Sequence, residues 1–392
     1  MATISYLAYF PVRCSSSRDS HDSNKQKLSS IKINGTSTKT ATKVDMAAGV
    51  ATRNDFVTEQ QARQNIPTTK QSVDHFRQAF SIEGGVGYRQ RVVVRSYEVG
   101  PDKTATLESI VNLLQETALN HVWMSGLLSD GFGATHEMMK NDLIWVVSRM
   151  QVQVDQYPIW GEVLEIDTWV QASGKNGMKR DWLIRSQATG HIFARATSTW
   201  VMMNQKTRRL SKMPEGVRGE IAPWFIEKQA IPDDVPEKIV KLDNNAKYVN
   251  NDLKPKRSDL DMNQHVNNVK YVRWMLETIP DNILETHQLT GITLEYRKEC
   301  GSSDIVQSLC DPDKDGMLIE GLKQENHDTS LLNGFSLGAG ILENSVFLGS
   351  FEKIPFRYTH LLRTTGNHKD EEIVRGRTVW KKKPEPSPFA SM

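Results

Sequence analysis

The chain has 392 residues, of which 38% are hydrophobic, and this is enough for two domains of ordinary size with a core in each. The formal net charge is +2, but residues 1–44 hold seven Lys or Arg against Asp19 and Asp22, so the rest of the chain carries −3. This balance argues against a strongly basic nucleic-acid-binding protein.

Cysteine usage and hydropathy indicate the kind of compartment in which the protein resides. The three cysteines, at positions 14, 300 and 310, do not suggest a secreted disulfide framework. No apolar run approaches the ~20 residues that cross a membrane as a helix. We therefore expect a soluble protein of a reducing compartment.

The first part of the chain has the composition of a targeting segment. Residues 1–44 are rich in Ser, Thr and Lys and poor in acidic residues, which is typical of an organelle transit peptide. A disordered tail has a similar composition and is the alternative. We expect a linker at residues 45–80.

The next segments predict one strand, one long helix and a set of further strands. Residues 88–99, YRQRVVVRSYEV, predict a strand, and residues 104–124 predict a helix because their apolar side chains recur at helical spacing. Four later segments alternate in polarity and are rich in β-branched or aromatic residues, so we expect an antiparallel meander. They are LIWVVSRMQVQV, EVLEIDTWVQA, MKRDWLIRS and IFARATSTWVMM.

The same order then recurs. Residues 253–261 predict a strand, residues 265–280 a second helix and residues 291–300, GITLEYRKEC, another strand. DIVQSL and EIVRGRTVWKKK extend the predicted sheet. A weak likeness between NLLQETA and RWMLETI, at the same place in each unit, indicates a duplication.

These elements predict an α+β fold of two domains, each a long helix wrapped by a curved antiparallel sheet. We expect the N-terminal domain at 81–212, a connector at 213–250 and the C-terminal domain at 251–385. The second domain would carry an insertion at about 311–350.

Several familiar sites are missing from the sequence. It has no Gly-x-Ser-x-Gly elbow, no Walker loop, no His-Glu-x-x-His and no Cys-x-x-Cys. These absences argue against serine-hydrolase, nucleotide and zinc chemistry.

The stretch DMNQHVNNVKYVRW, residues 261–274, crowds amides around one His before the second helix. If its first residues are extended, Asp261, Asn263 and His265 point to one side, at a helix start that favours negative charge. Such a group could position a water and hold an oxyanion. The alternative is an ordinary helix cap, because Asn is a preferred capping residue.

A second candidate pair closes the following predicted strand. Glu299 and Cys300 are adjacent, so in a strand they face opposite sides and only one can address His265. Cys300 shares its side with Leu294 and Tyr296, which suits a core thiol. Glu299 also fits an exposed row of charges.

Long stretches of the chain resemble the plant acyl-acyl-carrier-protein thioesterases of plastids. They include SDLDMNQHVNNVKYVRWMLETIP, ITLEYRKECGSSDIVQSL and RSYEVGPDKTATLESIVNLLQETALNH, and the similarity runs from about residue 88 to residue 309. The resemblance implies tandem hot-dog domains in a protein of the plastid stroma, with no cofactor and no metal. It implies hydrolysis of the thioester between a long-chain fatty acyl group and the phosphopantetheine arm of the acyl carrier protein (ACP), which ends chain elongation.

The resemblance also implies the site residues. Carried over by motif, they are Asp261, Asn263, His265, Glu299 and Cys300. In one version Cys300 is the nucleophile and His265 its base; in the other, Glu299 activates a water that Asn263 and His265 align, with Asp261 holding the network. The strand-face argument favours Glu299. A hot-dog 3-hydroxyacyl-ACP dehydratase and a non-catalytic acyl-ACP-binding module are the competing functions.

Two further sets of residues are expected from the same analogy. The acyl chain would lie in the first unit, against Leu114, Met138, Trp145 and Met150. Acidic ACP would dock on basic side chains. These are Lys175, Lys179, Arg180, Arg208, Arg209, Lys256 and Arg257. The saturated-chain or oleoyl subclass, chain length and oligomeric state, a homodimer included, stay open.

Overall fold

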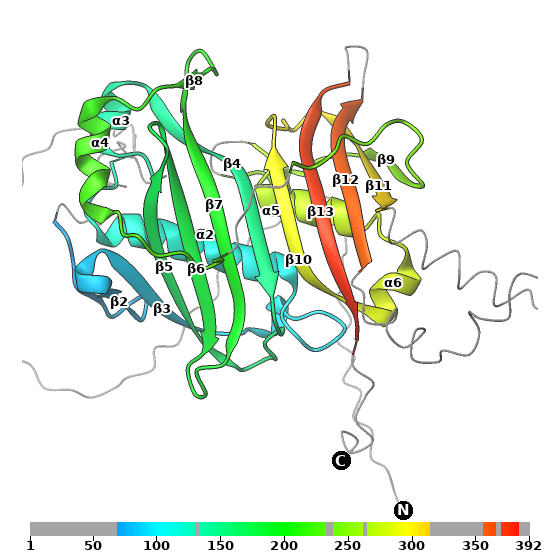
Figure 1. Ribbon diagram of the computed structural model, residues 1–392, viewed down its shortest axis with the longest axis horizontal. Coiled ribbons are helices and arrows are strands. Elements are labelled where there is room, and N and C mark those ends of the chain that lie inside the picture. The colour runs from blue at the N-terminus through cyan, green and yellow to red at the C-terminus, as the bar shows by residue number, and fades with distance from the viewer. Residues whose placement is uncertain are drawn as a thin grey trace, which may run out of the picture. The chain divides into compact units, whose positions relative to one another are not determined.

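The computed structural model describes residues 69–129, 133–232, 238–261, 265–313, 356–365 and 370–383. Its strands form one antiparallel sheet, shown in Figure 1. The strands are β1 (Val73–Asp74), β2 (Ala79–Ile82), β3 (Gly87–Val93), β4 (Leu143–Val154), β5 (Val163–Ser173), β6 (Gly177–Ser186), β7 (Ile192–Asn204), β8 (Leu210–Ser211), β9 (Tyr248–Leu253), β10 (His287–Tyr296), β11 (Ile305–Pro312), β12 (Phe356–Thr365) and β13 (Glu372–Lys382).

Helices connect and cover these strands. The α-helices are α2 (Leu107–Met124), α3 (His136–Lys140), α4 (Glu215–Ile221), α5 (Asn268–Leu276) and α6 (Asp281–Thr286). The short 3-10 helices are η1 (Glu83–Gly85), η2 (Ser96–Glu98), η3 (Ala222–Trp224) and η4 (Arg257–Asp259). None of the helices in the described ranges combines the length and apolar character needed to span a membrane. The predicted α+β class is confirmed.

The sheet is built from two halves that meet at β4 and β10. Its order is β1-β2-β3-β5-β6-β7-β4-β10-β13-β12-β11-β9, with β8 paired to the end of β7. Where the halves meet, β4 and β10 pair from Gln153 opposite Gly291 to Arg149 opposite Glu295. Arg149 Nη1 lies 3.2 Å from Glu295 Oε1 across this junction. The two halves therefore share one continuous hydrogen-bonded sheet.

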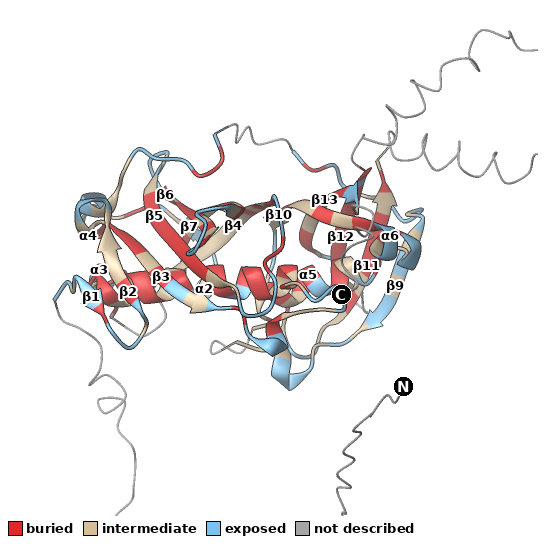
Figure 2. Cartoon of the chain, turned by 90° about the horizontal axis from the view of Figure 1, so that it is seen from below, coloured by how far each residue is buried: buried red, intermediate tan, exposed pale blue. Residues whose placement is uncertain are grey.

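One hydrophobic core extends through both halves. The α2 helix begins where Thr106 accepts a hydrogen bond from Ser109 N–H, and it buries Ile110 and Leu114 against the first half of the sheet. The α5 helix does the same in the second half with Val269 and Val272. Figure 2 shows the buried faces of both helices turned to the sheet. This arrangement matches the predicted duplication of a helix packed on a sheet.

The strand predicted at residues 88–99 is too long, and the one predicted at 253–261 is misplaced, because β9 covers Tyr248–Leu253 and shares only Leu253 with the prediction. β3 ends at Val93 and β9 ends at Leu253, and a 3-10 helix follows each. In η2 the Arg95 N–H donates to the Glu98 carboxylate at 2.8 Å, and in η4 the Lys256 N–H donates to Asp259 at 2.8 Å. The same cap in both halves supports the duplication, and it turns the chain before each long helix.

Other predicted ends also shift. The second helix covers only Asn268–Leu276 of the predicted 265–280, because Asn267 caps its start and the chain turns after Leu276 before α6 begins. β10 ends at Tyr296, so residues 297–300 lie outside the strand. β1 and the start of β2 lie in the segment expected to be linker. The expected transit peptide, and the part of the expected insertion beyond residue 313, lie outside the described residues.

Candidate active site

The loop between η4 and α5 folds back on itself at Asp261. The Asp261 N–H donates to the His265 carbonyl at 2.8 Å, and the His265 N–H donates to Asp261 Oδ1 at 3.1 Å. Leu260 and Val266 form an antiparallel bridge across the base of the loop. These bonds hold Asp261 and His265 together at the base of the loop. The extended run considered between them includes Asn263 and lies outside the described residues.

The start of α5 explains one of the asparagines. Asn267 is the N-cap, and its Oδ1 accepts a hydrogen bond from Val269 N–H at 3.0 Å. The Asn267 N–H donates in turn to the Asp259 carbonyl at 2.9 Å. Capping accounts for Asn267, as the alternative interpretation expected, but it leaves the His265 imidazole with no part in the helix start.

His265 and Glu299 come together although 34 positions separate them in the sequence. His265 Nε2 lies 3.6 Å from Glu299 Oε2, and both side chains are about 40% exposed. The Val266 N–H donates to the Cys300 carbonyl at 3.1 Å, which ties the two segments together beside this pair. The imidazole and the carboxylate thus share one solvent-accessible place, where they could act on a water.

Glu299 has a second side-chain partner, which the sequence did not reveal. The Arg208 guanidinium, from the turn between β7 and β8 in the first half, pairs through Nη2 with Glu299 Oε2. Arg208 was expected on a docking surface. It also reaches the candidate site, from the other half of the chain.

Cys300 faces away from this place. Its side chain is completely buried, and its backbone N–H donates to the Tyr271 hydroxyl at 3.2 Å. Burial, together with the nearby Asp304 carboxylate, raises the pKa of the Cys300 thiol to about 12. The thiolate that a covalent route requires is therefore scarce at neutral pH.

As strand alternation predicted, Glu299 and Cys300 lie in different environments, but strand alternation is not the cause. Both residues follow the end of β10, where the N–H groups of Arg297 and Lys298 donate to the same carbonyl, that of Ile373, at 2.8 and 3.1 Å. This irregular pairing, rather than strand alternation, precedes the turn that places the thiol inside and the carboxylate outside.

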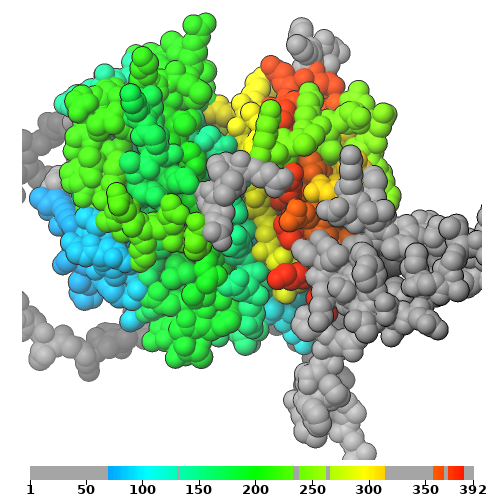
Figure 3. Space-filling model, in the orientation of Figure 1, coloured from blue at the N-terminus to red at the C-terminus, as the bar shows by residue number. Residues whose placement is uncertain are grey.

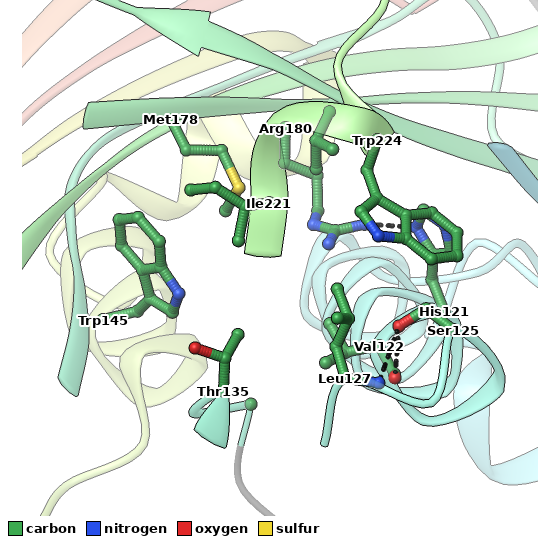
Figure 4. A pocket seen from close by; sticks show the side chains of 12 residues that line it. His121, Val122, Ser125, Leu127, Thr135, Trp145, Met178, Arg180, Ile221 and Trp224 are labelled. Atoms are coloured by element: carbon green, nitrogen blue, oxygen red, sulfur yellow. Dashed lines mark hydrogen bonds between the residues drawn. The ribbon is translucent and has the colours of Figure 1, made fainter. Parts of the chain in front are cut away.

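A cavity of about 60 Å³ lies in the first half of the chain. Trp145 and Met178 line one side of it, and Trp224 and Arg180 lie opposite (Figure 4). Of the residues expected along the acyl chain, Trp145 lines this cavity. Met138 packs in a small cluster next to Trp145, whereas Leu114 and Met150 belong to the main core.

The polar lining of the cavity corrects one expectation. Arg180 is buried, and its Nη1 lies 3.0 Å from His121 Nδ1 and 3.2 Å from Thr168 Oγ1. Burial lowers the pKa of Arg180 to about 10 and holds the pKa of His121 well below its usual range. Arg180 therefore cannot belong to an exposed docking surface. In the sequence, Arg180 stands between Lys179 and Asp181, so nothing in the local composition indicates that it is buried.

Comparison with known proteins identifies the family. The family model described as "Acyl-ACP thioesterase N-terminal domain" matches residues 85–221, and the one described as "Acyl-ACP thioesterase C-terminal domain" matches residues 242–345. The chain is 48% identical over 312 residues to the palmitoyl-acyl carrier protein thioesterase of Gossypium hirsutum, covering 79% of this chain and 68% of that protein. This chain belongs to the acyl-ACP thioesterase family.

Two further relatives agree with this placement. The oleoyl-acyl carrier protein thioesterase 1 of Arabidopsis thaliana is 43% identical over 316 residues, covering 79% of this chain and 80% of that protein. The solved 12:0-ACP thioesterase from Umbellularia californica is 41% identical with a TM-score of 0.63, covering 80% of this chain and 98% of that one. The predicted tandem hot-dog fold is confirmed.

Exposed basic side chains of this thioesterase lie at the β5–β6 and β7–β8 turns and in η4. The β7–β8 hairpin projects from the upper edge of the first half (Figure 3). The β5–β6 turn lies beside it, and the Asn176 side chain of that turn accepts a hydrogen bond from the Met213 N–H, just after β8. A groove of about 400 Å³ with Leu210 and Lys212 in its wall lies at these turns. The exposed members of the expected docking set are Lys175, Arg208, Arg209, Lys256 and Arg257, and Lys179 is half-buried.

Proposed function

We propose that this chain hydrolyses long-chain fatty acyl-ACP to free fatty acid and ACP in the plastid stroma, with Glu299 as general base. Family membership supplies the thioester of acyl-ACP as the substrate class. The relatives from Gossypium and Arabidopsis are named chloroplastic, which supports the plastid location. The observation that carries the choice of base is that Glu299 lies accessible beside His265 while Cys300 is buried.

The chemical step that we propose needs no covalent enzyme intermediate. A Glu299 oxygen takes a proton from water, and the water oxygen attacks the thioester carbonyl carbon. The carbon–sulfur bond of the tetrahedral intermediate then breaks. The phosphopantetheine sulfur leaves as a thiolate and recovers the proton from Glu299 or His265, so acid and thiol are the products.

The other proposed site residues orient this reaction. Asp261 fixes the loop that carries His265, because its carboxylate accepts the His265 N–H. His265 would align the water and stabilise the developing oxyanion together with Asn263. The assignment of Asn263 is supported by the family motif alone.

We propose that the fatty acyl group of the substrate binds within the first half of the protein. The cavity beside Trp145 supports this, since ligand sites are concave and mostly apolar. Met138 would shape its wall from behind. Leu114 and Met150 would act through core packing.

We propose that ACP docks on the basic side chains around the two turns and η4. Arg209, Lys256 and Arg257 are exposed and would attract an acidic carrier. The chemical test is incubation of the protein with acyl-ACPs of graded length and unsaturation, followed by measurement of free fatty acid. Enoyl-ACP as the product would indicate a dehydratase, and tight binding without product would indicate a binding module.

A further inference from the structure

The Glu299 carboxylate is held from one side only. Arg208 pairs with its Oε2, and His265 Nε2 faces that same oxygen at 3.6 Å. Within the part of the chain that the structure describes, no hydrogen bond reaches Oε1. One oxygen is thus engaged, while the other is left for a water.

Arg208 is set in place by a tightly closed hairpin. The Asn204 side chain accepts the N–H groups of Lys206 and Thr207 at 3.1 and 2.9 Å, and the Arg208 N–H donates to the Asn204 carbonyl at 2.9 Å. Arg208 itself has a φ of 55°, in the left-handed region that a non-glycine residue seldom adopts. The turn thereby directs a side chain of the first half to a carboxylate 91 residues later.

The other charged groups near Glu299 have partners of their own. Lys298 pairs with Glu371, and Arg297 pairs with Glu295. Asp304 accepts the Gly301 N–H at 2.9 Å on the side of Cys300. Among the residues that the structure describes, His265 and Arg208 are therefore the groups that can set the charge and direction of Glu299.

We propose that Arg208 is a positioning residue for the reaction, which keeps Glu299 ionised and turns its free Oε1 toward the attacking water. A guanidinium competes with the proton for a carboxylate oxygen and binds it in a fixed plane. The first half would then contribute a charged side chain to a site otherwise built in the second half. This inference rests on the proposed role of Glu299 as base.

The test uses the full chain and two substrates. A long-chain acyl-N-acetylcysteamine thioester carries neither protein nor phosphate, so docking cannot affect it, and acyl-ACP serves as the second substrate. On the small thioester, Arg208→Gln should lower kcat about tenfold and move the acid limb of the pH profile up by about one unit, because the group that favours the ionised carboxylate is gone. Arg208→Lys keeps the positive charge but lacks the planar guanidinium. It should therefore leave the acid limb of the pH profile where it is in the wild type and have a kcat between those of the wild type and Arg208→Gln.

Lys206→Gln is the matched control. Lys206 lies in the same turn and also forms an ion pair, but with Asp142 at 2.7 Å. This variant should leave the small-thioester profile unchanged. Thermal unfolding of each variant checks that the fold is intact, and an NMR titration of His265 shows whether the moving limb belongs to the imidazole.

Three outcomes would overturn the inference. Arg208→Gln could act only on acyl-ACP, which would make Arg208 a docking residue; it could lower kcat with no shift of the acid limb, which would mean a structural role; or the limb could follow His265. Failure of the proposed function looks different, because Glu299→Gln would then retain activity on both substrates.

Discussion

At the scale of single residues, two neighbours in the chain occupy opposite environments. Glu299 is accessible, pairs with Arg208 and faces His265, whereas Cys300 is buried with its thiol pKa raised to about 12. A nucleophilic thiol needs a depressed pKa and access to substrate. The environment of Cys300 provides neither of these, so the two candidate mechanisms make opposite predictions for this pair.

We expect Cys300→Ala to keep most of its turnover and Glu299→Ala to lose nearly all of it. Removal of a general base typically costs 10²–10⁴-fold in rate, roughly. Initial rates of free fatty acid release from acyl-ACP measure both effects. Loss of activity in Cys300→Ala, with the fold intact and with Glu299→Ala still active, would establish the covalent route instead.

The sequence could predict His265 and Glu299 as candidate site residues, but not all of the side chains around them. His265 and Glu299 carry chemistry that a motif displays. Arg208 and Arg180 both appeared as members of basic runs, yet one pairs with Glu299 and the other is buried beside His121. Only the three-dimensional pairing of distant segments separates these fates, because local composition is the same for a solvated and a buried arginine.

At the scale of elements, the start of α5 joins helix capping to the site. Asn267 caps the helix two residues after His265, and its N–H is bound to the Asp259 carbonyl. The cap thus fixes the direction in which the loop with His265 enters the helix.

We expect Asn267→Ala to lower the free energy of unfolding by about 1 kcal/mol, because the Val269 N–H loses its acceptor. Asn267→Asp keeps an acceptor oxygen and is the control, which should stay close to the wild type. Urea unfolding followed by circular dichroism measures the difference. Equal stability of all three proteins would show that the cap contributes nothing.

Elements were predictable where side-chain period decides them, and their ends were not. The β-branched and aromatic residues and the partial alternation of β4 to β7 indicate strands, although β5 is buried on both faces from Leu164 to Val170. The ends of β3 and β9 depend on Glu98 and Asp259, whose carboxylates accept a backbone N–H three residues earlier. Such local caps leave no trace in hydrophobic periodicity, so the strand predicted at 88–99 ran on through the first cap, and the strand predicted at 253–261 was placed on the second.

At the scale of the whole molecule, both halves carry exposed basic side chains, at two turns of the first half and in η4, although the chain beyond residue 44 carries −3 overall. We expect added salt to reduce kcat/KM for acyl-ACP several-fold, roughly, and to leave a small acyl thioester nearly unaffected. The reason is that ions screen charges over about 8 Å at physiological ionic strength.

Steady-state kinetics over a salt series check this expectation. Arg209→Glu with Lys256→Glu should abolish most of the salt dependence on acyl-ACP. Equal salt effects on both substrates would contradict the proposed docking surface.

Burial of histidine links the core to acid stability. In β12, His360 is fully buried, and its Nε2 lies 2.8 Å from Thr378 Oγ1. The Trp380 indole N–H donates to that same hydroxyl at 2.9 Å. Burial lowers the pKa of His360 to about 3, so the imidazole stays neutral in the folded protein.

This pKa fixes the sign of a pH effect on stability. The unfolded chain protonates His360 below its ordinary pKa of about 6.5, whereas the folded protein resists protonation until about pH 3, so stability falls as pH falls through this window. Between pH 7 and pH 5 the loss from His360 is about 2 kcal/mol. His360→Gln should shrink the measured drop in unfolding free energy by that amount, while His75→Gln, at an exposed position, should leave it unchanged. Urea titrations at the two pH values measure both, and a full drop in His360→Gln would mean that the buried imidazole is charged in the folded protein.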